Sequence, residues 1–260
     1  MNIAEFFDEN YRSEERYWWR ESVRYSGDPA DYPHSLLTQM TLRLIADCPP
    51  GRALDLGAGE GTDSIRLALM GYDVDAVEIS KVGAEKIKWF AAEARADVNV
   101  INADIELYEP NGIFDVVICN GALHYIEDKR SVISAMQEAT RIGGINVISL
   151  WSTFTAVPEC HEQVPIFCDD EDGIISRLYR HWTNEFIYHD RAKSESSHSD
   201  MPPHSHSHIK LIARKAASVR DRSVLAGVRG RDDGNNKTRH LVEICSGLIA
   251  ASDQPGDTRL

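Results

Sequence analysis

The sequence has little that would suit a membrane or a nucleic acid. It contains no run of eighteen apolar residues, which disfavours a membrane-spanning helix. Its first residues are acidic and aromatic, without the apolar core of a signal peptide. Lysine and arginine total 28 against 41 aspartates and glutamates, and the formal net charge is −13. We therefore expect no membrane partner and no nucleic-acid partner, because phosphate backbones bind basic surfaces.

Cysteine is also scarce, and two familiar catalytic motifs are missing. Five cysteines occur at irregular spacing, which predicts reduced thiols in a cytoplasmic protein. The G-x-S-x-G elbow of serine hydrolases is absent. The G-x-G-x-x-G turn of dinucleotide-binding proteins is absent as well, although a nicotinamide-dependent oxidoreductase stays an alternative. Cys160 and Cys168 form a C-x7-C pair, a weak pattern for holding a metalloid.

The most informative stretch is ALDLGAGEGT, at residues 53–62. An apolar strand leads into Gly57, Gly59 and Gly61, and a helical pattern follows. Glycines in such a turn let the backbone bend sharply and approach a ligand closely. Asp55, inside the strand, would repel a pyrophosphate but could accept a hydrogen bond from an ammonium group. The combination predicts a ligand with an amine and no phosphates, and S-adenosylmethionine is such a ligand.

Short apolar runs alternate with helical patterns over the next hundred residues. The apolar runs lie at 53–56, 71–78, 98–104, 114–120 and 144–150, and the helical patterns at 82–93 and 131–139. This alternation predicts a parallel sheet covered by helices on both faces. Glu78 closes the second run at the distance where an acid binds ribose hydroxyls. Asp104 closes the third run and could accept from an adenine amino group.

These motifs resemble those of the class I S-adenosylmethionine-dependent methyltransferases. ALDLGAGEG matches the family's first motif, DAVEIS its ribose-binding acid, NADIE its adenine-side acid and FDVVICNGALHYI its post-cofactor strand. A narrower likeness to the small tellurite-resistance-like methyltransferases rests on GYDVDAVE, MQEATRIGGINVISL, EDGIISRLYRHW and HIKLIARK. The resemblance implies an α/β fold with a doubly wound, mostly parallel seven-stranded sheet whose last strand is antiparallel. Residues 185–190 and 209–214 would be the sixth and seventh strands.

The resemblance also divides the chain into parts. Residues 1–49 would form a helical cap or lid, residues 50–215 the cofactor-binding domain, and residues 216–260 a flexible tail. The S-adenosylmethionine contacts that we expect come from the lid and from the carboxyl ends of the strands. They are Tyr17, Tyr32, Ser35, Leu36, Asp55, Gly57, Ala58, Gly59, Gly61, Glu78, Ile79, Asp104, Ile105 and Asn120.

The acceptor side is predicted from position alone. His124 and Tyr125 follow the fourth strand, and His124 could act as a general base near neutral pH or simply pack. Phe167, Arg177 and Tyr179 lie in an insertion at 151–182, which is interpreted as the wall of the acceptor pocket or as a structural insertion. We expect methylation of a small molecule on oxygen or nitrogen, by a monomer or homodimer. Sulfur or metalloid methylation and a non-catalytic cofactor sensor remain alternatives.

The segment SESSHSDMPPHSHSHIK is rich in histidine. His204, His206 and His208 would share one face of an extended chain, and three imidazoles can bind zinc or copper. The prolines and serines around them favour a solvated hairpin loop between the last two strands. The sequence therefore predicts no metal site.

Overall fold

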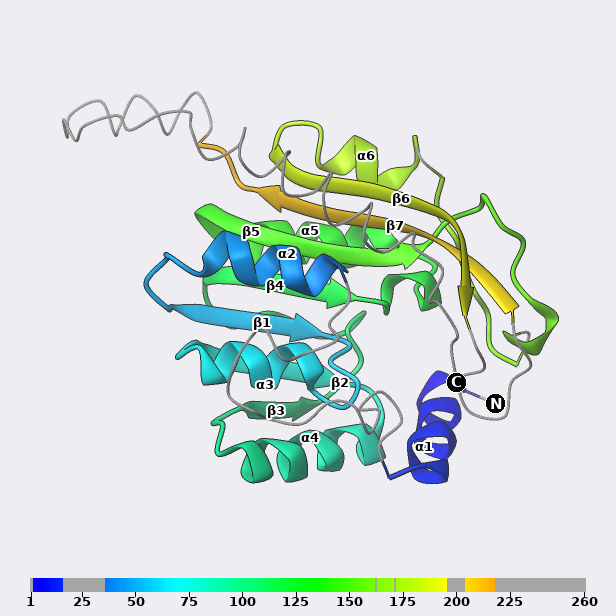
Figure 1. Ribbon diagram of the computed structural model, residues 1–260, viewed down its shortest axis with the longest axis horizontal. Coiled ribbons are helices and arrows are strands. Elements are labelled where there is room, and N and C mark those ends of the chain that lie inside the picture. The colour runs from blue at the N-terminus through cyan, green and yellow to red at the C-terminus, as the bar shows by residue number, and fades with distance from the viewer. Residues whose placement is uncertain (1, 16–35, 162, 171, 196–203, 218–260) are drawn as a thin grey trace, which may run out of the picture. The chain divides into compact units, whose positions relative to one another are not determined.

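The structure is a computed structural model, and it describes the chain in five stretches (Figure 1). These are residues 2–15, 36–161, 163–170, 172–195 and 204–217. The chain divides into two units between Ala216 and Ala217, and every element named below belongs to the first unit. Within the described stretches, no helix has both the length and the apolar character needed to cross a membrane.

A seven-stranded sheet forms the centre of the described structure, with strand order β3-β2-β1-β4-β5-β7-β6. The strands are β1 (Arg52–Leu56), β2 (Asp73–Glu78), β3 (Asn99–Asn102), β4 (Phe114–Asn120), β5 (Thr140–Trp151), β6 (Thr183–Glu195) and β7 (His204–Arg214). All pairs among β1 to β5 are parallel, whereas β7 is antiparallel to both β5 and β6. The predicted doubly wound, mostly parallel sheet with an antiparallel last strand is confirmed.

Helices cover both faces of the sheet, with α2 in front of it and α5 behind it in Figure 1. The helices are α1 (Ile3–Ser13), α2 (Leu36–Ile45), α3 (Thr62–Leu69), α4 (Lys81–Ala94), α5 (Lys129–Ala139) and α6 (Ile174–Leu178), with short 3-10 turns η2 (Leu123–Tyr125) and η3 (Glu159–His161). Side chains alternate along β1. Leu54 and Leu56 join the core that includes α5, whereas Asp55 contacts Ser64 on α3.

The last two strands are longer than the sequence predicted. They begin at Thr183 and His204 rather than at residues 185 and 209. His204, His206 and His208 therefore lie on β7, and the prediction of a solvated hairpin loop at these residues is wrong. The reason is tertiary, because residues 204–206 pair with β6 and residues 208–214 pair with both β5 and β6. Such pairing overrides the weak strand preference of a Ser- and His-rich segment.

Candidate cofactor site

The glycine turn joins the end of β1 to the start of α3. Gly57, Gly59 and Gly61 have φ angles of 72°, 61° and 83°, a region that residues with a Cβ rarely adopt. The N–H of Gly57 donates to the carbonyl of Val77 on β2, at 2.9 Å. A Cβ on Gly57 would overlap the Cβ of Ala122, in the segment after β4. The turn is thus bonded to β2 and lies close to the segment after β4, so it needs glycine.

Asp55 lies below this turn, and its side chain is almost fully buried. Only 2% of the residue is exposed, and its carboxylate accepts a hydrogen bond of 2.6 Å from the hydroxyl of Ser64. Burial, and then the charge of Asp63, raises the pKa of Asp55 to about 7. Asp63 is buried too, and it accepts from Thr38 at 3.0 Å and from Asn120 at 2.9 Å. Two buried carboxyls side by side suit a bound cation.

Glu78 ends β2 and supports the turn from the other side. One carboxylate oxygen accepts from the N–H of Gly59 at 2.7 Å, and the other accepts from the N–H of Ser80 at 2.8 Å. Burial raises the pKa of Glu78 to about 7, although these two backbone hydrogen bonds oppose the rise. Each carboxylate oxygen has a second lone pair. Glu78 can therefore accept from a ligand hydroxyl while it still holds the turn.

The other predicted cofactor residues lie along the same edge. Strands β3, β2, β1 and β4 are parallel neighbours, so their carboxyl ends meet at one edge of the sheet. Ile79 follows β2 and is half-buried. Asp104 follows β3, and its carboxylate accepts from the N–H of Glu106 at 2.9 Å. Ile105 and Ala58 pack in apolar clusters. The N–H of Ala58 donates to Val77 and its carbonyl accepts from Gly61, so Ala58 shapes the turn rather than offering a polar group to a ligand.

Part of the predicted lid lies outside the described residues. This holds for Tyr17, Tyr32 and Ser35, and for the side chain of Leu36, the first residue of α2. Their predicted contacts with the cofactor stay predictions.

The helix α1 lies at the carboxyl edge of the sheet. Asp8 accepts from the hydroxyl of Ser80 at 2.5 Å and from the N–H of Val82 at 3.1 Å, which joins α1 to the start of α4. On the same helix, the Phe7 ring packs edge-on against the Tyr125 ring, with centroids 5.2 Å apart. The helix α1 therefore contacts both the start of α4, through Asp8, and the segment after β4, through Phe7.

His124 is less accessible than its predicted role requires. It is buried in η2, and its ring stacks on Trp151 with centroids 4.6 Å apart and an angle of 9°. Its Nδ1 has no hydrogen-bond partner among the described residues. Burial is the main cause that holds the pKa of His124 well below its ordinary value, and the charges of His208 and His206 add to this effect. The imidazole is neutral and weakly basic here, which favours the packing alternative over a general base.

The insertion at 151–182 brings only part of the predicted acceptor wall together. The N–H of Phe167 donates to the carbonyl of His124 at 2.7 Å, so Phe167 lies beside η2. Arg177 is exposed on α6. Tyr179 is 1% exposed, and its hydroxyl donates to Asn146 at 2.7 Å. Its ring belongs to the core behind the sheet. The prediction that Tyr179 lines the acceptor pocket is therefore wrong.

Several residues at this site were missed by the sequence reasoning. Asp63 and Ser64 open α3 directly after the glycine turn, where an acid at a helix N-terminus could have been noticed. Asp8 and Thr38 come from helices far away in the sequence. No local pattern marks them, because their contacts depend on how those helices pack on the sheet.

The family described as "Methyltransferase domain" matches residues 50–195. The chain belongs to this family. The probable S-adenosyl-L-methionine-dependent methyltransferase TehB of Haemophilus influenzae is 28% identical over 165 residues, which cover 61% of this chain and 53% of that protein. The family resemblance predicted from the motifs is confirmed, including its narrower form.

Two further comparisons fit this family. A ubiquinone biosynthesis O-methyltransferase of Rickettsia canadensis is 29% identical over 96 residues, covering 37% of this chain and 41% of that protein. The crystal structure of TehB from Haemophilus influenzae has a TM-score of 0.60 at 20% identity, covering 72% of this chain and 65% of that chain, and it shares the fold. The chain spans about half the length of the curated relatives that it matches.

Proposed function

We propose that this protein transfers a methyl group from S-adenosylmethionine to a small-molecule acceptor. The observation that carries the proposal is the pair of buried carboxyls, Asp55 and Glu78, around a turn of three positive-φ glycines. Asp55 would accept from the ammonium group of the cofactor, and Glu78 would accept from the ribose hydroxyls. Membership of the methyltransferase family and the named function of the TehB relative support this assignment.

The adenine would bind farther along the same edge. Asp104, after β3, would accept from its amino group, while Ile79 and Ile105 would supply neighbouring backbone. Asn120 ends β4 and already donates to Asp63, so it would position that acid. A dinucleotide fits less well, because a pyrophosphate would meet two buried carboxyls instead of a helix N-terminus free of acids.

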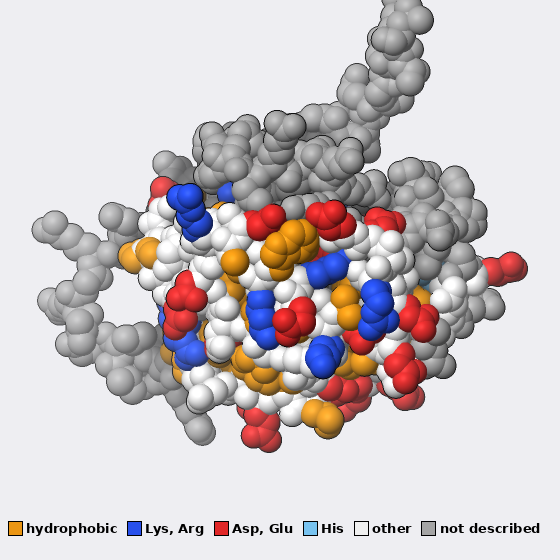
Figure 2. Space-filling model, turned by 90° about the horizontal axis from the view of Figure 1, so that it is seen from below, with side chains coloured by type: hydrophobic (Ala, Val, Ile, Leu, Met, Phe, Trp, Pro, Cys, Tyr) orange, Lys and Arg blue, Asp and Glu red, His pale blue; other side chains and the backbone are white. Residues whose placement is uncertain are grey.

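We propose a small, neutral or cationic acceptor rather than a nucleic acid. The net charge of −13 supports this choice. On the face shown in Figure 2, the described Lys and Arg side chains are mixed with Asp and Glu side chains and form no continuous basic stripe. The O-methyltransferase among the relatives supports oxygen as the attacking atom. We keep nitrogen beside oxygen, and sulfur or a metalloid is the second candidate.

The acceptor would lie beside Tyr125 and Phe167. Tyr125 contacts α1, and Phe167 is bonded to η2, so both border the region after β4 where the methyl group should lie. Lys129 lies 5.6 Å above the Phe167 ring. Because His124 is buried and weakly basic, we propose that it positions this segment and that alignment of acceptor and methyl group supplies most of the rate.

Two measurements test the proposal. Thermal-shift assays should show stabilisation by S-adenosylmethionine and S-adenosylhomocysteine and none by NAD or NADP, and stabilisation by the nicotinamide cofactors instead would overturn it. Transfer of labelled methyl to members of a metabolite panel should then identify the acceptor class. Tight cofactor binding without any turnover across oxygen, nitrogen, sulfur and metalloid acceptors would favour a cofactor sensor instead.

A further inference from the structure

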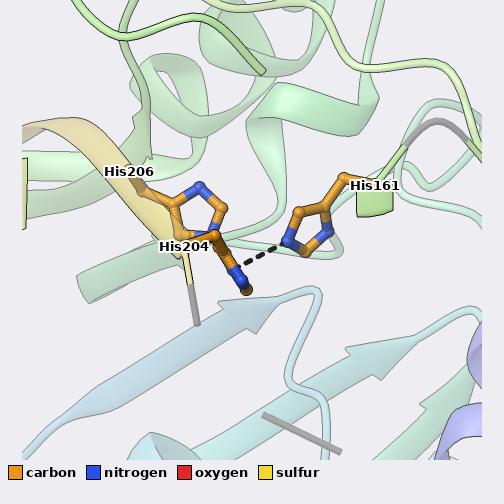
Figure 3. Close-up of side chains that lie close together, drawn as sticks. All are labelled: His161, His204 and His206. Carbon is orange, nitrogen blue, oxygen red and sulfur yellow. Dashed lines mark hydrogen bonds between the residues drawn. The ribbon is translucent and has the colours of Figure 1, made fainter. Parts of the chain in front are cut away.

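Three histidines from distant parts of the sequence converge at one point (Figure 3). His161 lies in η3, within the insertion that follows β5, whereas His204 and His206 lie on β7. The Nε2 atom of His204 is 3.1 Å from that of His161 and 2.8 Å from that of His206. The ring nitrogens that these residues offer all lie within 4.8 Å of one another.

This arrangement does not suit hydrogen bonding between imidazoles. A ring nitrogen carries either one hydrogen or one in-plane lone pair. The Nε2 atom of His204 therefore cannot make a full hydrogen bond to both of its neighbours at once, although both are at hydrogen-bond distance. A cation at the point of convergence would use one lone pair from each ring.

Two of the three nitrogen–nitrogen separations are close to those of a metal centre. Two nitrogens bound to one tetrahedral Zn²⁺ at about 2.0–2.1 Å lie roughly 3.3 Å apart. The observed separations of 3.1 and 2.8 Å are slightly shorter. The third pair, His161 and His206, is bounded only by the 4.8 Å that contains the whole cluster. Binding the ion would therefore also draw these two nitrogens together, by up to about 1.5 Å.

The surroundings hold two of the rings in place. His206 stacks on Trp151 with centroids 3.9 Å apart, and His161 packs edge-on against Trp151 at 4.8 Å. His161 and His206 are 4% and 3% exposed, whereas His204 is half-buried. The inner side of the site therefore packs against Trp151, and the site is reachable from the side of His204.

We propose that His161, His204 and His206 bind one divalent transition-metal ion of the zinc type, with a fourth position open on the side of His204. Three neutral imidazoles and an open position suit Zn²⁺, and Cu²⁺ or Co²⁺ can occupy the same donors. The ion fastens the insertion to β7, because its ligands come from both. The proposal does not rest on the methyltransferase function. His208, which the sequence grouped with His204 and His206, is replaced as a ligand by His161.

Zinc titration tests the site. Tag-free protein, freed of metal by dialysis against a chelator, should bind one Zn²⁺ per chain in calorimetry, and its melting temperature should rise. His204→Gln and His161→Gln should each weaken Zn²⁺ binding by roughly hundredfold or more, because each variant removes one of the three nitrogens that bind the same ion. His181→Gln is the matched control, since His181 is exposed and contacts Arg180 rather than this cluster.

Each outcome decides the proposal. Loss of the site in both ligand variants but not in the control supports it, provided that far-UV circular dichroism shows both variants folded. If parent protein shows no stoichiometric site, or if His161→Gln binds Zn²⁺ as the parent does, the three-histidine site is wrong. Should His161→Gln fail to fold, electron paramagnetic resonance of Cu²⁺ on the parent protein counts the bound nitrogens. Three nitrogens support the site, and fewer contradict it.

Discussion

Cofactor affinity should rise with pH through the neutral range. The perturbation is a change of pH from 6 to 8, which ionises Asp55 and Glu78, both with a pKa of about 7 in the ligand-free protein. Only an ionised carboxylate accepts fully from the ammonium group or from ribose hydroxyls. Binding therefore favours the ionised forms and releases protons when the ligand is added below pH 7.

The size of the effect follows from the two pKa values. At pH 6 a carboxyl with a pKa of about 7 is roughly one-tenth ionised, and at pH 8 it is about nine-tenths ionised. Each carboxyl that must ionise thus weakens binding about tenfold at pH 6 relative to pH 8. Because the charge of Glu78 is one of the causes that raise the pKa of Asp55, the two carboxyls do not titrate independently. The dissociation constant should therefore differ by more than about tenfold, and by up to about a hundredfold, between the two pH values.

In the ligand-free protein, ionisation of Asp55 and Glu78 has the opposite effect, because it lowers the stability of the folded state. Because burial raises both folded-state pKa values above the unfolded values near 4, their contribution to stability is present below pH 4 and is lost as the pH rises to about 7. Stabilisation by the ligand should consequently be larger at pH 8 than at pH 6.

Calorimetry with S-adenosylhomocysteine, in two buffers of different ionisation enthalpy, measures both affinity and proton release. The matched variant is Asp55→Asn, which keeps an acceptor for Ser64 but cannot ionise. Its affinity should vary only about tenfold over the same range, through Glu78 alone. A parent dissociation constant that is equal at pH 6 and pH 8, without proton release, would refute the reasoning.

Four further predictions follow from named contacts. Glu78→Ala should weaken cofactor binding by roughly tenfold or more in calorimetry, since it removes an ionised acceptor; an unchanged constant would point to another acid. Tyr179→Phe should lower the free energy of unfolding by about 1–3 kcal/mol, because Asn146 loses its donor, and denaturation that matches the parent would contradict this. His124→Phe should keep kcat within a few fold. A decrease in kcat of roughly 10²–10⁴-fold would instead support His124 as a general base. A chain that ends at Ala217 keeps every described strand and should keep its melting temperature; a large decrease would show that the tail contributes to folding.

The sequence predicted the fold, and it placed the residues that we propose for cofactor binding in one local unit. Residues 53–78 contain the glycine turn and both acids, Asp55 and Glu78, within one strand–helix–strand unit. Such a unit is local, so spacing alone determines where its side chains fall. The alternation of apolar runs with helical patterns was also enough to predict a mostly parallel sheet, which is confirmed.

The acceptor side depended on tertiary structure. Tyr179 looked like a pocket residue in sequence, yet it packs behind the sheet because Asn146 on β5 accepts from its hydroxyl. Burial and the neighbouring histidines, rather than its place after β4, determine the basicity of His124. These effects come from residues far away in the chain, and no local pattern reports them.

The histidine cluster shows most clearly which features the sequence predicts and which depend on the tertiary structure. Sequence periodicity correctly placed His204 and His206 on one face of an extended chain. It could not show that the chain is extended there, since that depends on pairing with β6. Nor could it find His161, because only the packing of the insertion against Trp151 brings that ring to β7. Periodicity determines which side chains share a face, whereas long-range packing determines what they meet.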